Sequence, residues 1–443
     1  MDARGRRTCC RRISPSAPSI DTRHRQRGKP VRKSVALSLV QVGFLAACGG
    51  GGYMTTPPPP TQTIAPPGPP NVETVTVDAG PPGLTFASIN TPFVSVQVCV
   101  AGTSTCKTID HIEVDTGSVG LRILSSVLTA APAITLAAET DSGGNPLAEC
   151  LQFADGTSWG SLAVADITLP VSMETAANVH VHIIGDPAYP TVPLTCTGTP
   201  ENTVDQFGAN GILGVGPFVQ DCGTFCATTS PAPPVYYSCP SSITCAAANA
   251  SLTEQVANPV SMFVTDNNGV IVELPAVGAA GTTTVSGSLV FGIGTRTNNA
   301  LGTATVLPLI ATSIGDFITA TYKGTAYADG YIDSGANANF FTDSSLTTPA
   351  CTGSNAGVFY CPTSMMSETA SLKGTTSTTL TANFTVGNAD TITAGYAVFP
   401  GLGGPIGDTM GFDLGLPFFY GHNVFTAIEN ANTPGGIGPY FAY

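Results

Sequence analysis

Two short segments of the chain place an aspartate, a small hydroxyl residue and a glycine directly after an apolar run. Asp115-Thr-Gly follows the first run, and Asp333-Ser-Gly follows a second run far downstream. An acidic side chain at the end of a buried strand needs a polar partner, and a second turn of the same kind supplies one. Two carboxylates in close contact share one proton. Such a pair can activate a water molecule and protonate a leaving amine.

The other residues of the two turns are suited to holding the carboxylates together. The hydroxyl groups of Thr116 and Ser334 can form hydrogen bonds across the junction. Gly117 and Gly335 allow the two loops to approach closely, because glycine has no side chain. One such motif alone is a common surface turn. Two copies, each behind strand-forming residues, predict a dyad that needs neither a metal nor a cofactor.

A longer internal repeat surrounds these turns. Residues 210–216 read Asn-Gly-Ile-Leu-Gly-Val-Gly, and residues 412–417 read Phe-Asp-Leu-Gly-Leu-Pro. Each Asp turn is therefore followed, many residues later, by a hydrophobic segment containing glycine. Two widely spaced copies predict two lobes related by a pseudo-two-fold axis rather than a solenoid.

The composition favours strands over helices. Only 10% of residues are charged, and the chain has 50 glycines and 36 prolines. Residues 93–100 and 107–114 alternate around a turn, and residues 261–274 contain an Asn-Gly hairpin signal. No long amphipathic helix is evident. These features predict an all-β protein.

The charge distribution excludes one class of partner. The formal net charge is −13, and most of the 16 Lys and Arg residues precede Cys48, so the remaining body is strongly acidic. An acidic body repels nucleic acid and anionic membrane surfaces. We therefore expect no nucleic-acid binding.

The N-terminal region predicts export. Residues 1–30 form an Arg-rich extension that we exclude from the fold, and residues 31–48 combine basic residues with a short apolar run. Leu45-Ala-Ala-Cys48 resembles a bacterial lipobox, which implies lipidation at Cys48 and a membrane anchor in the cell envelope, at the outer membrane. Residues 49–72 are rich in Gly and Pro and predict a tether.

The remaining cysteines predict a disulfide framework, because their number is even and the chain is exported. Close spacing suggests pairs 99–106, 222–226, 239–245 and 351–361, which leaves 150–196, although spacing alone does not fix the connectivity. A zinc site built from residues 222, 226, 239 and 245 is the alternative. The candidates are Cys99, Cys106, Cys150, Cys196, Cys222, Cys226, Cys239, Cys245, Cys351 and Cys361.

From residue 93 to the C-terminus, the order of these motifs resembles the pepsin-like aspartic peptidases. Asp115-Thr-Gly-Ser resembles the first motif of that family, Asp333-Ser-Gly-Ala the second, and Gly211-Ile-Leu-Gly the hydrophobic element of the first lobe. More narrowly, the chain resembles bacterial lipoproteins with a domain of unknown function related to that fold. The resemblance implies a bilobal fold of two β-barrel-like lobes with an active-site cleft between them. It places the lobes at residues 73–299 and 300–443.

The resemblance also implies roles for individual residues. Asp115 and Asp333 are the expected catalytic pair, and Ser118 is expected to donate a hydrogen bond to Asp115. The implied activity is that of an aspartic-type endopeptidase, a monomer that binds an extended peptide or protein and works best at low pH. A hairpin at residues 152–160 takes the place of the family's flap. Its candidate substrate-binding residues are Phe153, Asp155, Gly156, Thr157, Ser158 and Trp159.

Several positions depart from the pepsin-like pattern. Ala336 stands where a hydroxyl residue is usual, Phe153 where the flap has Tyr, and Asp413 where a hydrophobic residue is expected. These departures support an alternative in which the fold is an inactive binding or surface protein of the cell envelope. Trp159, the only tryptophan, is either a flap residue or a core residue.

Other constellations carry less weight. His180 and His182 alternate on one strand and could form half of a metal site, but no partner ligand is evident. No G-x-S-x-G motif supports a serine triad. The glycines at 292–294 lack the lysine and helix of a phosphate-binding loop.

Overall fold

The computed structural model describes residues 62–443, apart from residues 230, 232 and 312–315. The predicted extension, the signal peptide, Cys48 and the first part of the tether lie outside the described residues. Within the described part of the chain, no helix has the length and apolar character to cross a membrane.

The protein is mainly β, as the composition predicted, and its first sheet contains a six-stranded barrel. The barrel closes because β2 pairs with β3 on one side and with β7 on the other. Its strands alternate between buried and partly exposed residues over much of their length, which directs their apolar side chains inward. They are β2 (Pro92–Val100), β3 (Cys106–Asp115), β9 (Gly211–Val215), β4 (Val119–Leu124), β8 (Thr175–Ile184) and β7 (Thr157–Thr168).

Further strands widen one side of this barrel. The hairpin of β6 (Leu147–Gln152) with β7 is continued by β10 (Tyr236–Ser241) and β11 (Thr244–Ala247), and β5 (Ala137–Ala138) pairs with β7. The helices of this region are single turns: α1 (Ser125–Thr129), α2 (Val204–Phe207), α3 (Thr224–Thr228) and the 3-10 helix η1 (Pro259–Met262).

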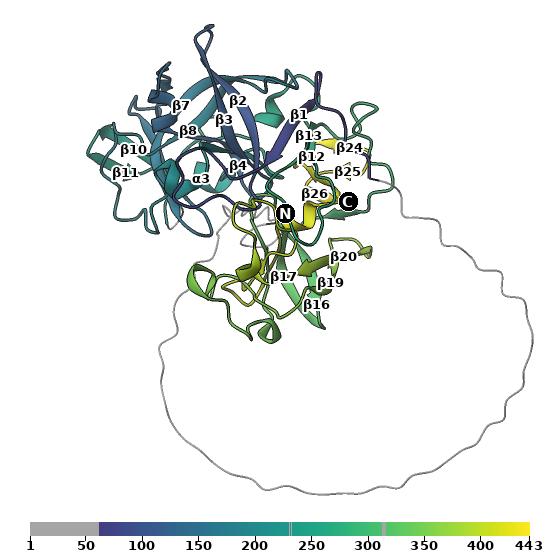
Figure 1. The fold of residues 1–443 in the computed structure, drawn as a ribbon. Coiled ribbons are helices and arrows are strands. Elements are labelled where there is room, and N and C mark those ends of the chain that lie inside the picture. The colour runs from purple at the N-terminus through teal and green to yellow at the C-terminus, as the bar shows by residue number, and fades with distance from the viewer. Residues whose placement is uncertain (1–61, 230, 232, 312–315) are drawn as a thin grey trace, which may run out of the picture. The chain divides into compact units, whose positions relative to one another are not determined.

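The first sheet continues beyond β2 into strands from both ends of the chain. In Figure 1, the purple β1 and the yellow C-terminal β26 belong to this common sheet. The boundary expected at residues 299 and 300 therefore does not separate two sheets, because the last strands return to the first one. The order is β1 (Val72–Val77), β13 (Val285–Phe291), β12 (Gly269–Glu273), β23 (Asn423–Ala427), β26 (Tyr440–Ala442) and β14 (Val306–Pro308).

A second sheet of eight strands forms the other β body, and β24 (Asn432–Thr433) pairs with β25 (Gly436–Ile437) apart from it. Tyr322, Phe341 and Phe412 pack together inside the second body. Its short helical turns are η2 (Ser344–Leu346), η3 (Gly353–Asn355), η4 (Ala389–Thr391) and α4 (Leu416–Phe419). The strand order is β20 (Thr379–Val386), β19 (Met366–Lys373), β16 (Asp316–Tyr322), β17 (Thr325–Ile332), β22 (Gly411–Leu414), β18 (Asn339–Phe340) and β21 (Gly403–Gly404), with β15 (Ile310–Ala311) beside β16.

The folded body begins earlier than the tether prediction allowed. The side chain of Gln62 donates hydrogen bonds to the carbonyl oxygens of Leu274 and His422, each at 2.9 Å. Ala65 is buried, and its amide donates to the carboxylate of Glu273 at 2.6 Å. Residues 62–71 are therefore packed against the sheet and are not part of a free linker.

All five expected disulfide pairs are present. They join residues 99 to 106, 150 to 196, 222 to 226, 239 to 245 and 351 to 361. The alternative of a four-cysteine zinc site is wrong, because those cysteines are oxidised in two pairs and offer no thiolates. Five disulfides indicate an exported protein that folds in an oxidising compartment.

The disulfides should differ in their contribution to stability. Cys150 and Cys196 are 46 residues apart, whereas Cys99 and Cys106 are 7 apart. A longer closed loop restricts the unfolded chain more, so the C150A/C196A variant should lose about 1.5–2 kcal/mol more stability than C99A/C106A. Urea-induced unfolding of both variants measures this difference, and equal losses would contradict the chain-entropy explanation.

Candidate active site

Each Asp turn follows a strand that has a parallel partner. β3 ends at Asp115 and pairs in parallel with β9, where Asp115 lies opposite Gly214. β17 ends at Ile332, directly before Asp333, and pairs in parallel with β22, where Ile332 lies opposite Leu414. The hydrophobic segments of the sequence repeat are therefore the strands that support the two turns. Both aspartates are buried, with exposed fractions of 0% and 5%.

The chain then returns along the same supporting strand in both halves. β4 pairs antiparallel with β9, and β18 meets β22 in the same sense. The third residue after each aspartate accepts a backbone hydrogen bond: Gly216 donates to the carbonyl of Ser118 at 2.8 Å, and Leu416 donates to that of Ala336 at 2.7 Å. Ala336 lacks the hydroxyl group that is usual at this position in pepsin-like peptidases, but this contact does not need it, because only the backbone takes part.

The two turns are joined by reciprocal hydrogen bonds. The amide of Thr116 donates to Ser334 Oγ at 3.1 Å, and the amide of Ser334 donates to Thr116 Oγ1 at 2.9 Å. Thr116 Oγ1 in turn donates to the carbonyl of Ile332, and Ser334 Oγ donates to the carbonyl of Val114 at 2.7 Å. Each hydroxyl thus binds the residue before the opposite aspartate, and Thr116 and Ser334 each take part in three of these four hydrogen bonds. The predicted hydrogen bonds of Thr116 and Ser334 across the junction are therefore formed.

The two carboxylates lie at this junction. Gly117 donates its amide to Asp115 Oδ1 at 2.7 Å, and Gly335 donates its amide to Asp333 Oδ1 at 2.8 Å. A methyl group at Gly117 would collide with the Asp333 carboxyl carbon at 2.5 Å. One at Gly335 would collide with Asp115 Oδ1, also at 2.5 Å. Each carboxylate therefore lies against the glycine of the opposite turn, and the absent side chains make the approach sterically feasible.

The hydrogen bond expected from Ser118 to Asp115 is not formed. Ser118 Oγ is buried and has no hydrogen-bond partner within the described part of the chain. Asp115 Oδ1 instead accepts a hydrogen bond from the backbone amide of Gly117 in the same turn. The role of Ser118 is to supply the backbone carbonyl that Gly216 binds.

The predicted flap hairpin exists, but it is not a free lid. β6 and β7 pair from Ala148 with Ser161 to Gln152 with Thr157, and the amide of Phe153 closes the turn by donating to the carbonyl of Gly156. The segment around residues 197–202 holds the returning strand. The Thr157 amide donates to the carbonyl of Thr199 at 2.7 Å, and the Trp159 amide donates to Asn202 Oδ1 at 2.9 Å.

The burial of the hairpin's side chains is also inconsistent with a mobile lid. Phe153 is buried against Phe207, with ring centroids 5.7 Å apart, and belongs to a cluster with Ile212. Thr157 and Ser158 are buried, and Gly156 abuts the side chain of Glu201. Among the six candidate flap residues, only Asp155 is exposed.

Trp159 is a core residue, which was one of the two alternatives considered. It is 2% exposed, its indole Nε1 donates to the carbonyl of Tyr189, and its ring meets Tyr237 edge-on at 5.2 Å. The neighbouring Cys150–Cys196 disulfide belongs to the same cluster. Substrate contact by Trp159 is therefore not supported.

A buried ionic network, absent from the sequence predictions, lies beside the first turn. Arg122 on β4 is fully buried and binds Glu149 on β6 through two nitrogens, at 2.8 and 3.2 Å. It also donates to Asp221 Oδ2 at 2.9 Å. His182 Nδ1 lies 3.0 Å from Glu149 Oε2, and the hydroxyl of Tyr236 donates to Asp221 Oδ1 at 2.6 Å.

The members of this network ionise differently. Burial opposes ionisation of Glu149, but the Arg122 guanidinium outweighs it and holds the pKa of Glu149 well below its usual range. Burial, together with the charge of Glu149, raises the pKa of Asp221. The network joins the strand after Asp115 to the hairpin. The sequence signal was the single arginine in the apolar run after the first turn.

Removing the central cation should strongly destabilise the protein. Arg122→Met leaves Glu149 and Asp221 buried without their counter-charge, which should lower the free energy of unfolding by about 3–5 kcal/mol. Lys323→Met is the control, because Lys323 is half exposed and should cost less than about 1 kcal/mol. Denaturant unfolding measures both variants, and comparable losses would refute the assigned role of Arg122.

Three other carboxyl groups make stability depend on pH. Burial raises the pKa of Glu139, Glu174 and Glu273 to about 7 from 4.5, with further contributions from Glu254 at the first and Asp266 at the second. The folded chain therefore retains protons that the unfolded chain releases between these values. The contribution of these three carboxyl groups to the free energy of unfolding is fully present below pH 4.5 and is lost as the pH rises through 7.

These three carboxyl groups should accordingly stabilise the protein more in mild acid than at neutral pH. We expect their contribution to the free energy of unfolding to fall by on the order of 1–3 kcal/mol from pH 5 to pH 8. Burial lowers the pKa of His180, His182 and His422, and these groups contribute with the opposite sign. Glu273→Gln cannot titrate, so its stability relative to the parent should rise from pH 5 to pH 8. Thermal unfolding across this range measures both proteins, and a difference between them that does not change with pH would contradict the assignment.

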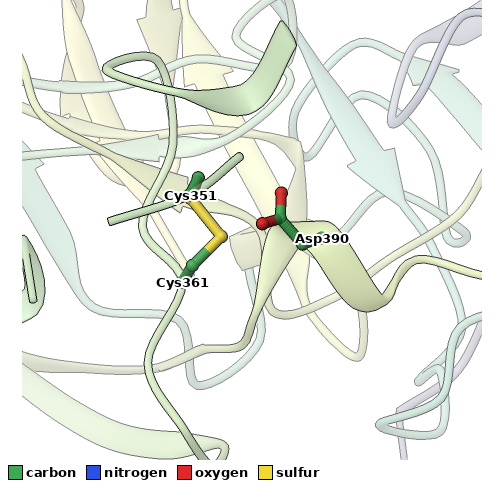
Figure 2. A group of neighbouring side chains, drawn as sticks. All are labelled: Cys351, Cys361 and Asp390. Atoms are coloured by element: carbon green, nitrogen blue, oxygen red, sulfur yellow. A yellow bond between two sulfur atoms is a disulfide. The ribbon is translucent and has the colours of Figure 1, made fainter. Parts of the chain in front are cut away.

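The structure offers little support for a metal site. His180 and His182 lie near different carboxylates, of Glu139 at 3.5 Å and of Glu149 at 3.0 Å. Within the described part of the chain, one group of three potential ligands lies close together: Cys351, Cys361 and Asp390 (Figure 2). The two sulfur atoms form a disulfide, and Asp390 accepts hydrogen bonds from Thr352 and Asn355. This group is a covalent and hydrogen-bonded loop anchor.

Comparison with known proteins identifies a family without assigning an activity. The family described as "Protein of unknown function (DUF3443)" matches residues 67–443, a stretch that contains both Asp turns and both β bodies. No curated protein matches the chain. Any function must therefore be argued from the residues themselves.

Proposed function

The chain belongs to the DUF3443 family, and we propose that it is an aspartic-type endopeptidase of pepsin-like architecture. Asp115 and Asp333 are its proposed catalytic residues. The observation that carries the proposal is the junction in which each carboxylate lies against the glycine of the other turn. The repeated strand arrangement behind the two turns supports a relation to the bilobal aspartic peptidases.

The proposed reaction uses one proton shared by the two carboxyl groups. The ionised carboxylate takes a proton from a water molecule while the water oxygen bonds to the peptide carbonyl carbon. The protonated carboxyl group gives its proton to the carbonyl oxygen, which produces a tetrahedral intermediate. The dyad then gives its proton to the nitrogen. As the carbon–nitrogen bond breaks, a hydroxyl of the intermediate returns a proton to the dyad, so that a carboxylic acid and an amine leave and the dyad again holds one proton.

The surrounding hydrogen bonds support such proton transfers. Gly117 and Gly335 donate to one oxygen of each carboxylate, which fixes the orientation of the groups before a substrate binds. The hydroxyls of Thr116 and Ser334 are fully engaged in joining the turns, so they position the dyad and do not react.

The proposed substrate is a peptide or an unfolded protein in an extended conformation. An extended chain can bind a β protein as an added strand, with main-chain hydrogen bonds supplying much of the affinity. Because the disulfides indicate an exported protein, we propose that the enzyme meets its substrate outside the cytoplasm. We further propose attachment to the envelope through lipidated Cys48, which lies outside the described residues.

One observation favours a second candidate function. The β6–β7 hairpin is held by hydrogen bonds and is largely buried, so it lacks the freedom of a closing flap. An inactive binding protein of the cell envelope would not require that motion. In this alternative, the Asp turns only join the two β bodies.

Cleavage of a denatured protein mixture between pH 3 and pH 7 distinguishes the two functions. Soluble protein lacking residues 1–48 should cleave in the acidic part of this range. Asp115→Asn and Asp333→Asn should each lower the rate by at least about 10³-fold, because either change removes an obligatory proton carrier.

Asp110→Asn is the matched control, since Asp110 lies on the same strand as Asp115 but is exposed, and its activity should be unchanged. Folding of every variant is checked by thermal unfolding. Folded wild-type protein that cleaves nothing would favour the binding protein.

A further inference from the structure

The connection between β1 and β2, residues 78–91, contacts parts of the chain that serve both Asp turns. Ser88 Oγ donates to the carbonyl of Gly208 at 2.8 Å, and the hydroxyl of Thr85 donates to Asp205 at 2.8 Å. Gly208 ends α2 shortly before β9, the strand that supports Asp115. The connection is thus attached to the first half by the loop that leads into its supporting strand.

Asn90, near the end of this connection, reaches into the second half. It is 1% exposed, and its backbone amide donates to the carbonyl of Ala397 at 2.7 Å. Its φ of 52° is in the left-handed region. Asparagine tolerates this region better than most residues, and glycine tolerates it best. The position therefore restricts which residues can replace it.

The side-chain amide of Asn90 uses its full hydrogen-bonding capacity. Nδ2 donates to the carbonyls of Asn337 and Phe399, each at 2.9 Å. Oδ1 accepts from the amide of Phe399 at 2.8 Å and from the hydroxyl of Tyr420 at 2.9 Å. An amide supplies two donors and two acceptor positions, so all four are occupied. Glutamine carries the same amide group, but its side chain is longer by one methylene.

One of these partners belongs to the loop of the second aspartate. On one side, this loop is held by β22 and the residues after it. The backbone amide of Asp333 donates to the carbonyl of Leu414, and the backbone amide of Leu416 donates to the carbonyl of Ala336. Asn90 holds the loop at Asn337, directly after these contacts. The loop is therefore fixed by its own sheet and by a residue from the connection that is attached to the loop before β9.

We propose that Asn90 is a positioning residue, which fixes the loop of Asp333 so that its carboxylate meets Asp115 in the reactive arrangement. The role in catalysis rests on the proposed peptidase function. The role in positioning does not, because it concerns the loop itself. Small displacements of reacting groups cost up to about 100-fold in rate, so loss of this anchor should lower kcat more than it changes KM.

Asn90→Gly tests the proposal, because glycine keeps the backbone conformation and removes only the amide. We expect kcat to fall by about 10–100-fold with KM nearly unchanged. We also expect hydrogen exchange to become faster at the amides of residues 334–338, while the barrel stays protected. The control is Asn178→Gly, which changes an exposed asparagine with φ 55° and should alter neither quantity.

Tyr420→Phe is the second variant and removes one of the four bonds to the amide. It should accelerate exchange in the same loop to a smaller extent, so the proposal stays testable if Asn90→Gly fails to fold. Faster exchange confined to this loop supports the positioning role, whether or not the wild-type protein cleaves a substrate. A wild-type protein that cleaves no substrate would count against the proposed peptidase function only. Unchanged exchange at residues 334–338, or an equal loss of protection throughout the chain, would overturn it.

Discussion

The reciprocal hydrogen bonds between Thr116 and Ser334 are the contact on which the candidate site depends. Each of these residues gives its hydroxyl proton to the strand end that carries the opposite aspartate, and each accepts the amide proton of the other. A shift of one turn relative to the other would break several of these bonds together. Because the residues are buried, the lost bonds would not be replaced by water. The strand ends that carry Asp115 and Asp333 are thereby held together by two buried hydroxyl side chains, each bound to backbone groups of the opposite turn.

The rest of the fold supplies the two strand ends at the right places. In each half, a strand that ends at the Asp turn pairs in parallel with a short hydrophobic strand, and the chain then returns antiparallel to it. Glycines on or directly after these supporting strands admit backbone where a side chain would collide, as at Gly214 on β9 and at Gly415 directly after β22. Strands from both ends of the described residues, β1 and β26, share the first sheet, so these two parts of the chain are held together as well.

Local chemistry predicted much of this from the sequence. The paired Asp turns, the hydrophobic repeat, the β6–β7 hairpin and the pairing of close cysteines all depend on residues near one another in the chain. The Asn-Gly hairpin predicted at residues 261–274 is not formed, because β12 pairs with β13 and β23 instead. The pairing of Cys150 with Cys196 followed only because the other cysteines had nearer partners. The pepsin-like architecture and the peptidase activity stay predictions.

Features set by long-range packing were not predictable in the same way. Arg122 gave a weak signal, since its partners Glu149 and Asp221 lie on distant segments that only the fold brings together. The immobilised hairpin depends on the segment around residue 200, which pairs with it through the backbone and carries no distinctive side-chain pattern. Trp159 is buried for the same reason, because β10 adds a strand beside the hairpin and brings Tyr237 against the indole.

We propose that Asp115 and Asp333 act together on one peptide bond. The most direct measurement is a calorimetric titration, near pH 4.5, with a peptide that carries a statine-type hydroxyl in place of the scissile carbonyl. Such a group mimics the tetrahedral intermediate and gains affinity only from a competent dyad. We predict binding of one peptide per chain, weakened by at least about 100-fold in Asp333→Asn. Wild-type protein that binds no better than this variant would contradict the claim.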